Sequence, residues 1–352
     1  MRKTLKPKTW GITVVALILI FILGVGALVV YVDPFFHFHG PVSSLEYPFI
    51  DERYQNDGIA RHYEYEAVIA GTSIAENFKA STVKALWGLE TIKQTASSAT
   101  YYEQDGYVRR AISYNPDIKL VFRSLDATRL TSGVRDVSYE DIPTYLYDDN
   151  RFNDIQYIYN KDVLQKVTEV INYTRAGNKT PDMDMYGAWY QYATYGREEV
   201  LKGLIDYSSY KEEIPFTKED EEIIKANIEE NILKTARENP DITFYVFLPP
   251  YSAAYWYGMV MTKQLGFVCE AEKFAVGMLL TEKNIKVFDF SDRLDITTNL
   301  DNYMDTLHYS EGISDMMLKW MYDGSGELTL DNYEAFYESL RDTYENYPYD
   351  YE

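Results

Sequence analysis

Basic residues, cysteine and histidine are all scarce in this sequence. The 34 lysines and arginines stand against 55 aspartates and glutamates, which gives a net charge of -21. A chain this acidic is poorly suited to the phosphates of nucleic acid, so we expect no nucleic acid among its partners. The one cysteine, Cys269, cannot form an intrachain disulfide, and it lies in an apolar stretch where buried, inert thiols are common.

Four histidines leave little material for a metal centre. His37 and His39 flank Phe38 in a short aromatic stretch, but no further group of ligands accompanies them. A protein zinc site needs three or four such ligands. We therefore expect packing roles for this pair, and we predict neither a metal site nor a cofactor.

Charged residues are absent between Thr9 and Val32. A stretch of this length and composition can cross a bilayer as a helix. Basic residues precede it and acidic residues follow it, a bias that places the start of the chain in the cytoplasm and the remainder outside. A cleaved signal peptide is the competing interpretation, but its apolar core would be shorter and no Ala-x-Ala-like site precedes Asp33. We predict a retained, single-pass anchor in the cell membrane.

The chain divides by composition into four segments and one insertion. Tyrosine and tryptophan are concentrated in the insertion, and these side chains suit both stacking on sugars and ordinary packing, so both interpretations stay open. The predicted divisions are the cytoplasmic start and anchor (1–32), a membrane-proximal connector (33–60), a globular domain (61–322) with its tyrosine-rich insertion (130–216), and an acidic tail (323–352).

Helical patterns and short apolar strands alternate along the globular domain. Asn-Pro-Asp-Ile occurs at 115–118 and again at 239–242, each time between a helical pattern and an apolar run. Because proline stops a helix and an apolar strand must be covered on both faces, this order predicts an α/β fold around a parallel sheet. The expected strands are 67–71, 86–94, 118–125, 242–248 and 285–290, and the expected helices are 101–114, 217–238, 274–284 and 312–322.

Ser73 follows directly on the first expected strand. The apolar run from Ala67 ends at Gly71 and Thr72, after which a helical pattern begins. Such a turn leaves a hydroxyl at the carboxyl end of the strand, and ligands of open α/β sheets bind in the crevice outside that edge. Ser73 is therefore a candidate nucleophile.

Asp305 and His308 supply a candidate base near the other end of the domain. They stand three residues apart in a segment that follows the last strand, so their loop belongs at the same edge of the sheet. This spacing lets the carboxylate accept a hydrogen bond from Nδ1 of the imidazole, which leaves Nε2 to take a proton from a serine hydroxyl. Ser73, His308 and Asp305 together form a candidate catalytic triad.

Gly71-Thr72-Ser73 and Asp305-Thr306-Leu307-His308 resemble the first and last motifs of the SGNH (GDSL-like) hydrolase superfamily. The resemblance covers roughly residues 64–322 without the insertion, and the chain lacks the Gly-x-Ser-x-Gly elbow of α/β-hydrolases. The anchor, the segment 33–36 and Pro249-Pro250-Tyr251 make it most similar to the membrane-anchored surface acyl-transfer branch. That branch includes the D-alanyl transfer protein of teichoic-acid modification and alginate O-acetyltransferase-like proteins.

This resemblance implies a three-layer, flavodoxin-like domain and an extracytoplasmic bacterial enzyme. The implied activity is that of a serine esterase or O-acyltransferase, which moves or removes an ester-linked acyl group on a cell-envelope polysaccharide or teichoic-acid-like polymer through an acyl-enzyme. The implied partners are the polymer, an acyl donor and a membrane-bound acyltransferase. A catalytically inactive glycan-binding or scaffolding protein of the envelope is the alternative.

The resemblance also implies three donors to an oxyanion: the backbone N–H of the nucleophile, a glycine N–H in the second motif and an asparagine side chain in the third. Besides Gly71 in the first motif, Ser98 occupies the glycine position and Asp126 lies nearest to the asparagine position. An ionised carboxylate cannot donate, and a lost donor costs roughly 3 to 4 kcal/mol of barrier. Three explanations stay open: Asp126 is protonated or turned away, Arg123 or Arg129 replaces it, or catalysis is weak.

Overall fold

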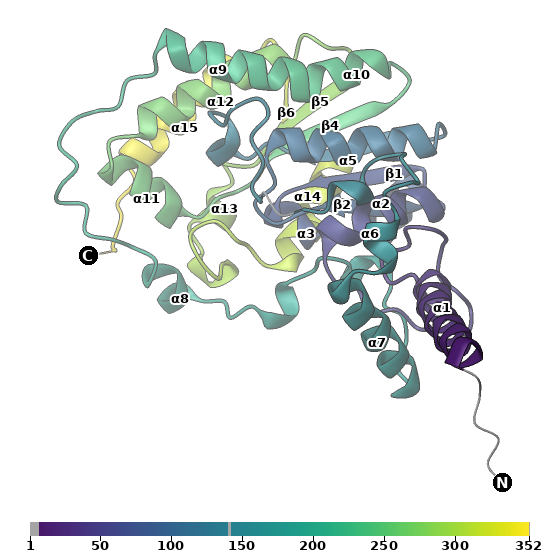
Figure 1. Ribbon diagram of the computed structural model, residues 1–352. Coiled ribbons are helices and arrows are strands. Elements are labelled where there is room, and N and C mark those ends of the chain that lie inside the picture. Colours follow the sequence, from purple (N-terminus) through teal and green to yellow (C-terminus); the bar gives the residue numbers. More distant parts are fainter. Residues whose placement is uncertain (1–6, 140–141, 352) are drawn as a thin grey trace. The chain divides into compact units, whose positions relative to one another are not determined.

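The computed structural model describes residues 7–139 and 142–351, which fall into two compact units (Figure 1). The first unit contains the described residues up to His62 together with 142–181. The second contains 63–139 and 182–351, and it carries every residue of the predicted site. The insertion expected over 130–216 is thus shared between the two units, and the expected tail clusters with the second.

A six-stranded sheet lies at the centre of the second unit, in the order β2-β1-β3-β4-β5-β6. The first five strands run parallel in the order typical of flavodoxin-like sheets, and β6 is antiparallel to β5. The predicted α/β class is therefore confirmed, although the sequence did not indicate the antiparallel edge. The strands are β1 (Ala67–Gly71), β2 (Thr91–Thr95), β3 (Leu120–Ser124), β4 (Thr243–Leu248), β5 (Ile285–Asp289) and β6 (Glu327–Leu328).

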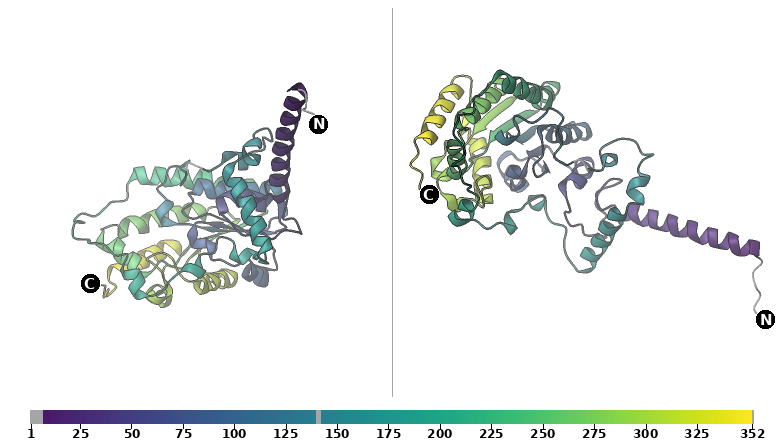
Figure 2. Two further views of the ribbon diagram at one scale, coloured as in Figure 1. Left: turned by 60° about the horizontal axis from the view of Figure 1, so that its bottom comes forward. Right: turned by 60° about the vertical axis from the view of Figure 1, so that its left-hand side comes forward.

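Helices cover both faces of this sheet (Figure 2). Neighbouring side chains of a strand point to opposite faces, and in β3 Phe122 packs against Trp87 of α4 whereas Arg123 reaches carbonyl groups of α5 and of a π-helical turn at 229–233. The helices of this unit are α3 (Ser73–Glu76), α4 (Ala80–Trp87), α5 (Tyr101–Tyr114), α8 (Arg197–Leu201), α9 (Lys218–Ile228), α10 (Lys234–Glu238), α11 (Ala253–Met261), α12 (Leu265–Leu279), α13 (Leu294–Thr297), α14 (Glu311–Asp323) and α15 (Tyr333–Glu345).

Two predicted elements differ from the structure by five residues or more at one end or both. The strand expected over 86–94 begins only at Thr91, because Trp87 still belongs to α4 and Gly88 ends that helix in the left-handed conformation with a φ of 73°. The helix expected over 274–284 begins at Leu265 and ends at Leu279, since the apolar residues that it buries start nine residues earlier than expected.

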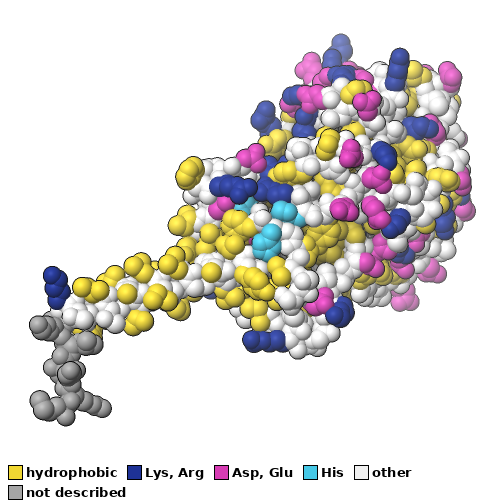
Figure 3. All heavy atoms as spheres, turned by 90° about the vertical axis from the view of Figure 1, so that its right-hand side faces the viewer, with side chains coloured by type: hydrophobic (Ala, Val, Ile, Leu, Met, Phe, Trp, Pro, Cys, Tyr) yellow, Lys and Arg dark blue, Asp and Glu magenta, His cyan; other side chains and the backbone are white. Residues whose placement is uncertain are grey.

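In the first unit, α1 (Pro7–Val32) is long and apolar enough to cross a membrane, and it is the one such helix in the described part of the chain. Hydrophobic side chains cover it along its length (Figure 3), and many of them are exposed. The other helices of this unit are α2 (Glu52–His62), α6 (Ile155–Ile158) and α7 (Lys161–Arg175).

Asp33 organises the turn that follows α1. Its φ of 42° lies in the left-handed region, where a short polar side chain is tolerated best. The carboxylate accepts hydrogen bonds from the backbone N–H groups of His37, Phe38 and His39 and from the hydroxyl of Tyr157. The segment after the anchor therefore begins as a compact turn built around one buried carboxylate.

The two histidines of this turn have separate partners. His37 Nε2 lies 2.8 Å from a carboxylate oxygen of Asp154, and the ring of His39 contacts the carbonyl oxygens of Val30 and Gly40 at 2.7 Å each. No group of three or more His, Cys, Asp or Glu residues in the described chain is arranged to hold a metal ion. Both side chains pack and hydrogen-bond within the first unit.

Two buried carboxyl groups lie close to α15 in the second unit. Burial raises the pKa of Asp289 to about 6, although hydrogen bonds from Ser291 and Tyr337 oppose the rise. Burial likewise raises the pKa of Glu272, and the charge of Asp289 raises it further. Oε2 of Glu272 has no hydrogen-bond partner among the described residues. Glu272 is therefore a polar group that the core accommodates poorly when it is ionised.

Glu272→Met should raise the free energy of unfolding near pH 8 by about 1 to 3 kcal/mol, because it removes an unpaired polar group from the core. Native Glu272 holds its proton to a higher pH than the unfolded chain does, so it lowers stability as the pH rises above the ordinary value of 4.5. The gain should therefore shrink toward pH 5 in denaturant unfolding of the full chain. Glu270→Met on the same helix, which removes a partly exposed partner of Lys273, is the control, and an equal gain at both pH values would contradict the prediction.

Candidate functional site

The predicted site residues gather at the carboxyl edge of the sheet. Ser73 follows β1, Ser98 follows β2, Asp126 follows β3 and Tyr251 follows β4. These strands are parallel, so their carboxyl ends meet at one edge, and the strand order reverses between β1 and β3. Such a reversal opens the crevice in which α/β proteins bind ligands.

Gly71 allows the chain to turn sharply out of β1. A Cβ at this position would collide with the hydroxyl of Ser124 and lie 2.8 Å from the Cβ of Ala75, so no larger residue fits without rearrangement. The backbone N–H of Thr72 donates to the Ser124 hydroxyl at 3.4 Å, and the Thr72 hydroxyl accepts from the N–H of Ile74. Close packing against β3 thus places the next residue, Ser73, at the start of α3.

Ser73, His308 and Asp305 are joined by hydrogen bonds. Ser73 Oγ lies 2.8 Å from His308 Nε2, and His308 Nδ1 lies 2.7 Å from Asp305 Oδ2. The other carboxylate oxygen of Asp305 accepts the backbone N–H groups of Leu307 and His308 at 2.8 Å each. The structure therefore brings together the three side chains that the sequence singles out, although Ser73 and His308 are 235 residues apart.

The environment of Asp305 favours its ionised form. Burial alone would raise the pKa of this carboxyl, but the hydrogen bond and charge of His308 and the two backbone N–H donors outweigh burial and hold the pKa below its usual value. An ionised Asp305 accepts the Nδ1–H of His308, which leaves the Nε2 lone pair facing the Ser73 hydroxyl. This tautomer is the one in which His308 can take a proton from the serine.

Trp189 belongs to this site and was not identified from the sequence. Its indole N–H donates to the carbonyl oxygen of Ser73 at 2.9 Å, and its ring meets the ring of His308 edge to face, with centroids 5.3 Å apart. The backbone N–H groups of Trp189 and Tyr190 both donate to the side-chain oxygen of Asn77. Trp189 lies 116 residues from Ser73, and a tryptophan within the tyrosine-rich insertion was the one signal for it.

Asp126 is occupied as an acceptor. Its carboxylate accepts the hydroxyls of Tyr251 and Thr128 at 2.7 Å each and the hydroxyl of Thr72 at 3.3 Å. The backbone N–H of Thr128 adds a fourth contact, and the residue is 7% exposed. Asp126 therefore supplies no donor to an oxyanion, and its carboxylate instead ties together the loops after β1, β3 and β4.

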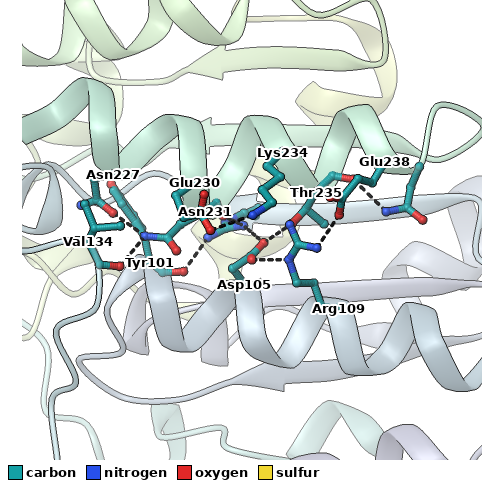
Figure 4. Close-up of polar contacts among 12 residues, drawn as sticks. Tyr101, Asp105, Arg109, Val134, Asn227, Glu230, Asn231, Lys234, Thr235 and Glu238 are labelled. Atoms are coloured by element: carbon teal, nitrogen blue, oxygen red, sulfur yellow. Dashed lines mark hydrogen bonds and ion pairs between the residues drawn. The ribbon is translucent and has the colours of Figure 1, made fainter.

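Arg123 reaches the helical layer and not the crevice. It is 1% exposed and donates to the carbonyl oxygens of Tyr101 and Asn231 at 3.0 and 2.7 Å. Asp105, which lies 3.6 Å from the guanidinium, belongs to the polar network between α5 and the helices opposite it (Figure 4). Arg123 therefore cannot serve as the replacement donor considered for the oxyanion. Arg129 stands in the short turn after Asp126, where its carbonyl oxygen accepts a hydrogen bond from Asn227.

Ser98 adopts a conformation that favours glycine. Its φ is 59°, in the left-handed region that side chains with a Cβ rarely enter, and its carbonyl oxygen accepts the hydroxyl of Ser138. A residue in this conformation, one strand away from Ser73, occupies the place that the resemblance gives to a glycine. The observation supports the proposed equivalence of Ser98 with that glycine.

Comparisons with known proteins add little to this geometry. No family model matches the chain, and no curated protein matches it. One solved structure, provisionally described as a platelet activating factor from Streptococcus pneumonia, is similar to this chain with a TM-score of 0.40 and 11% sequence identity. The match covers 78% of this chain and 91% of the chain in that structure. A likeness at this level transfers no activity to this chain.

Trp189→Phe should slow phosphonylation of Ser73 by a fluorophosphonate about tenfold, because it keeps an aromatic ring beside His308 but removes the hydrogen bond that fixes the turn carrying Ser73, worth about 1 kcal/mol. The second-order rate of labelling by a fluorophosphonate in the full-length protein measures this effect. Tyr192→Phe is the matched control, since Tyr192 is 87% exposed in the same segment. Labelling of the Trp189 variant at the wild-type rate would show that the indole N–H does not position Ser73.

Proposed function

We propose that the protein is a membrane-anchored serine esterase or O-acyltransferase of the SGNH type. Its substrates are ester-linked acyl groups on a cell-envelope polysaccharide or teichoic-acid-like polymer. The observation that carries the proposal is the unbroken relay from Ser73 through His308 to Asp305, with contacts of 2.8 and 2.7 Å. A serine hydroxyl hydrogen-bonded to an imidazole that a carboxylate orients is the arrangement that activates serine as a nucleophile.

The reaction begins when Ser73 Oγ attacks the ester carbonyl carbon and His308 Nε2 accepts the serine proton. Asp305 stabilises the imidazolium that forms. Collapse of the tetrahedral intermediate breaks the ester bond, and His308 returns the proton to the departing alcohol, which leaves an acyl-enzyme on Ser73. Water or a sugar hydroxyl then attacks the acyl-enzyme with His308 again as base. The first acceptor gives an esterase and the second a transferase.

The oxyanion needs donors other than Asp126. Ser73 is the first residue of α3, so its backbone N–H has no acceptor within that helix. We assign this group and the backbone N–H of Ser98 as the donors. Removing one donor from such a site typically lowers the rate by about 10²- to 10³-fold, so a site with only two backbone donors is expected to be slow toward simple esters.

We infer the cellular place of this chemistry from α1 and its flanking charges. The helix is long and apolar enough to span a bilayer, and the basic residues before it and acidic residues after it favour a cytoplasmic start. We propose that the second unit faces the outside of the cell membrane, where envelope polymers are found. A membrane-bound acyltransferase that delivers the acyl group is the partner expected for the transferase version.

Ser73→Ala should abolish covalent labelling of the full-length protein by a fluorophosphonate, because the reagent traps an activated serine. Asp305→Asn should slow labelling by about 10³- to 10⁴-fold, since the neutral amide neither fixes the required tautomer nor stabilises the imidazolium. Ser113→Ala removes an exposed serine of α5 and serves as the control for labelling elsewhere. Wild-type protein that is folded yet labels no more than the Ser73 variant would overturn the proposal.

A catalytically inactive glycan-binding or scaffolding protein remains the second candidate. The observation in its favour is Asp126, whose carboxylate accepts hydrogen bonds where the resemblance implies a side-chain donor. Complementation of a deletion strain separates the two functions. Full complementation by the Ser73→Ala chain would support the inactive scaffold, whereas polymer acylation that stays at the level of the deletion strain, with normal amounts of folded protein, would support the enzyme.

A further inference from the structure

A second cleft lies in the unit that carries the triad. Its volume is about 560 Å³, and it is formed by the loop between α8 and α9, by α11 and by the end of the described chain. None of the triad residues lines it. The side chains that distinguish it are four tyrosines and two lysines, Tyr207, Tyr210, Tyr257, Tyr351, Lys211 and Lys263.

Two pairs of these tyrosine rings meet at right angles, and Tyr207 and Tyr210 are tilted by 51°. The centroids of Tyr207 and Tyr257 are 5.6 Å apart with an interplanar angle of 87°, and those of Tyr257 and Tyr351 are 5.4 Å apart with an angle of 88°. Half-buried tyrosines offer flat apolar faces for sugar rings together with hydroxyls that can bond to sugar hydroxyls.

The two lysines give the cleft a positive charge in a strongly acidic chain. Neither Lys211 nor Lys263 forms an ion pair with a described residue, although the chain has 55 acidic residues to offer. The one carboxylate that lines the cleft, Asp206, accepts hydrogen bonds from the N–H and hydroxyl of Ser208. Two free cations beside aromatic faces favour a ligand that combines sugar rings with negative charge.

Lys263 occupies a backbone position where glycine would fit better. It follows the residue that caps α11, and its φ of 62° lies in the left-handed region. Glycine is the residue most often found at this position after a helix, because a Cβ is unfavourable there. A lysine in this place costs conformational energy, which points to a role for its side chain.

One segment connects the cleft to the triad. We call residues 182–216 the strap; at its start Trp189 holds the nucleophile turn. Farther along, the backbone N–H of Gly196 donates to the carbonyl oxygen of Tyr303 and that of Arg197 to the carboxylate of Asp301, on the segment that leads to His308. The guanidinium of Arg197 then lies over the ring of Tyr351 in the cleft, 5.3 Å from its centroid. The strap therefore runs from the nucleophile to the cleft.

We propose that this cleft binds a polysaccharide carrying carboxylate or phosphate groups, as a site separate from the triad on the same strap. This inference rests on the proposed function in one respect: it takes the bound polysaccharide to be the polymer whose ester the triad processes. Binding itself needs no catalysis. It can therefore be measured in the full-length Ser73→Ala protein, so a failure of the cleft and a failure of the enzyme are distinguishable.

Titration calorimetry of the full-length Ser73→Ala protein in detergent tests the ligand class. The probes are oligogalacturonate, a phosphomannan fragment, neutral maltohexaose and inorganic polyphosphate. We expect one of the two charged glycans to bind at least about tenfold more tightly than either maltohexaose or polyphosphate. Which of the two binds identifies the carboxylate or the phosphate as the charged group. Binding of neither glycan, or equal binding of polyphosphate, would overturn the proposal.

Lys263→Gly separates binding from folding. Because glycine suits the left-handed backbone, the melting temperature should stay the same or rise, while affinity for the charged glycan falls about tenfold. Lys225→Ala, which removes an exposed lysine of α9 outside the cleft, is the control and should retain full affinity. Unchanged affinity in the Lys263 variant would contradict the assignment of the cleft. If the glycan binds but wild-type Ser73 is not labelled by a fluorophosphonate, the binding cleft is supported and the proposed enzyme activity is contradicted.

Discussion

The carboxylate of Asp126 is the interaction on which the site depends. Ser73, Asp305 and His308 lie in turns, a loop or the start of a short helix outside the sheet, and such segments are rigid only where something ties them to their neighbours. Asp126 accepts hydroxyls from Thr72 beside the nucleophile and from Tyr251 after β4, and its backbone carbonyl accepts the hydroxyl of Tyr101. Hydrogen bonds to a buried charged acceptor are each worth about 1.5 to 3 kcal/mol, so this residue holds three loops in register.

The contacts of Asp126 give a structural reason for an aspartate at the position where the resemblance implies an asparagine. An aspartate in place of an asparagine donor looks like a defect when only the oxyanion is considered. In the structure the same carboxylate positions the turn that presents Ser73, while the strap brings Trp189 to the other side of that turn. At this position the chain has an acceptor that holds the turn carrying Ser73, where the resemblance implies a donor to an oxyanion.

Buried polar groups recur away from the crevice as well. Arg123 bonds to carbonyl groups of two helices, and Asn227 and Asn231 bond to one another and to carbonyl groups of the loop after Asp126 (Figure 4). Groups of this kind are costly when unpaired, so the helices and the loop can pack in only one register. The loop that carries Asp126 is therefore fixed from the helical layer as well as from the strands.

The sequence by itself determined the elements and the chemistry that short-range patterns encode. Proline breaks, apolar runs and the Asp305–His308 spacing are local, and they led correctly to a mostly parallel α/β sheet and to the side chains that meet at its edge. Features that depend on contacts between distant segments became visible only in the tertiary structure. Segments more than a hundred residues apart in the sequence supply the partners of Arg123 and Asp126 and bring Trp189 to Ser73. The cleft at Lys263 likewise combines separate segments. No local sequence pattern indicates how such segments pack.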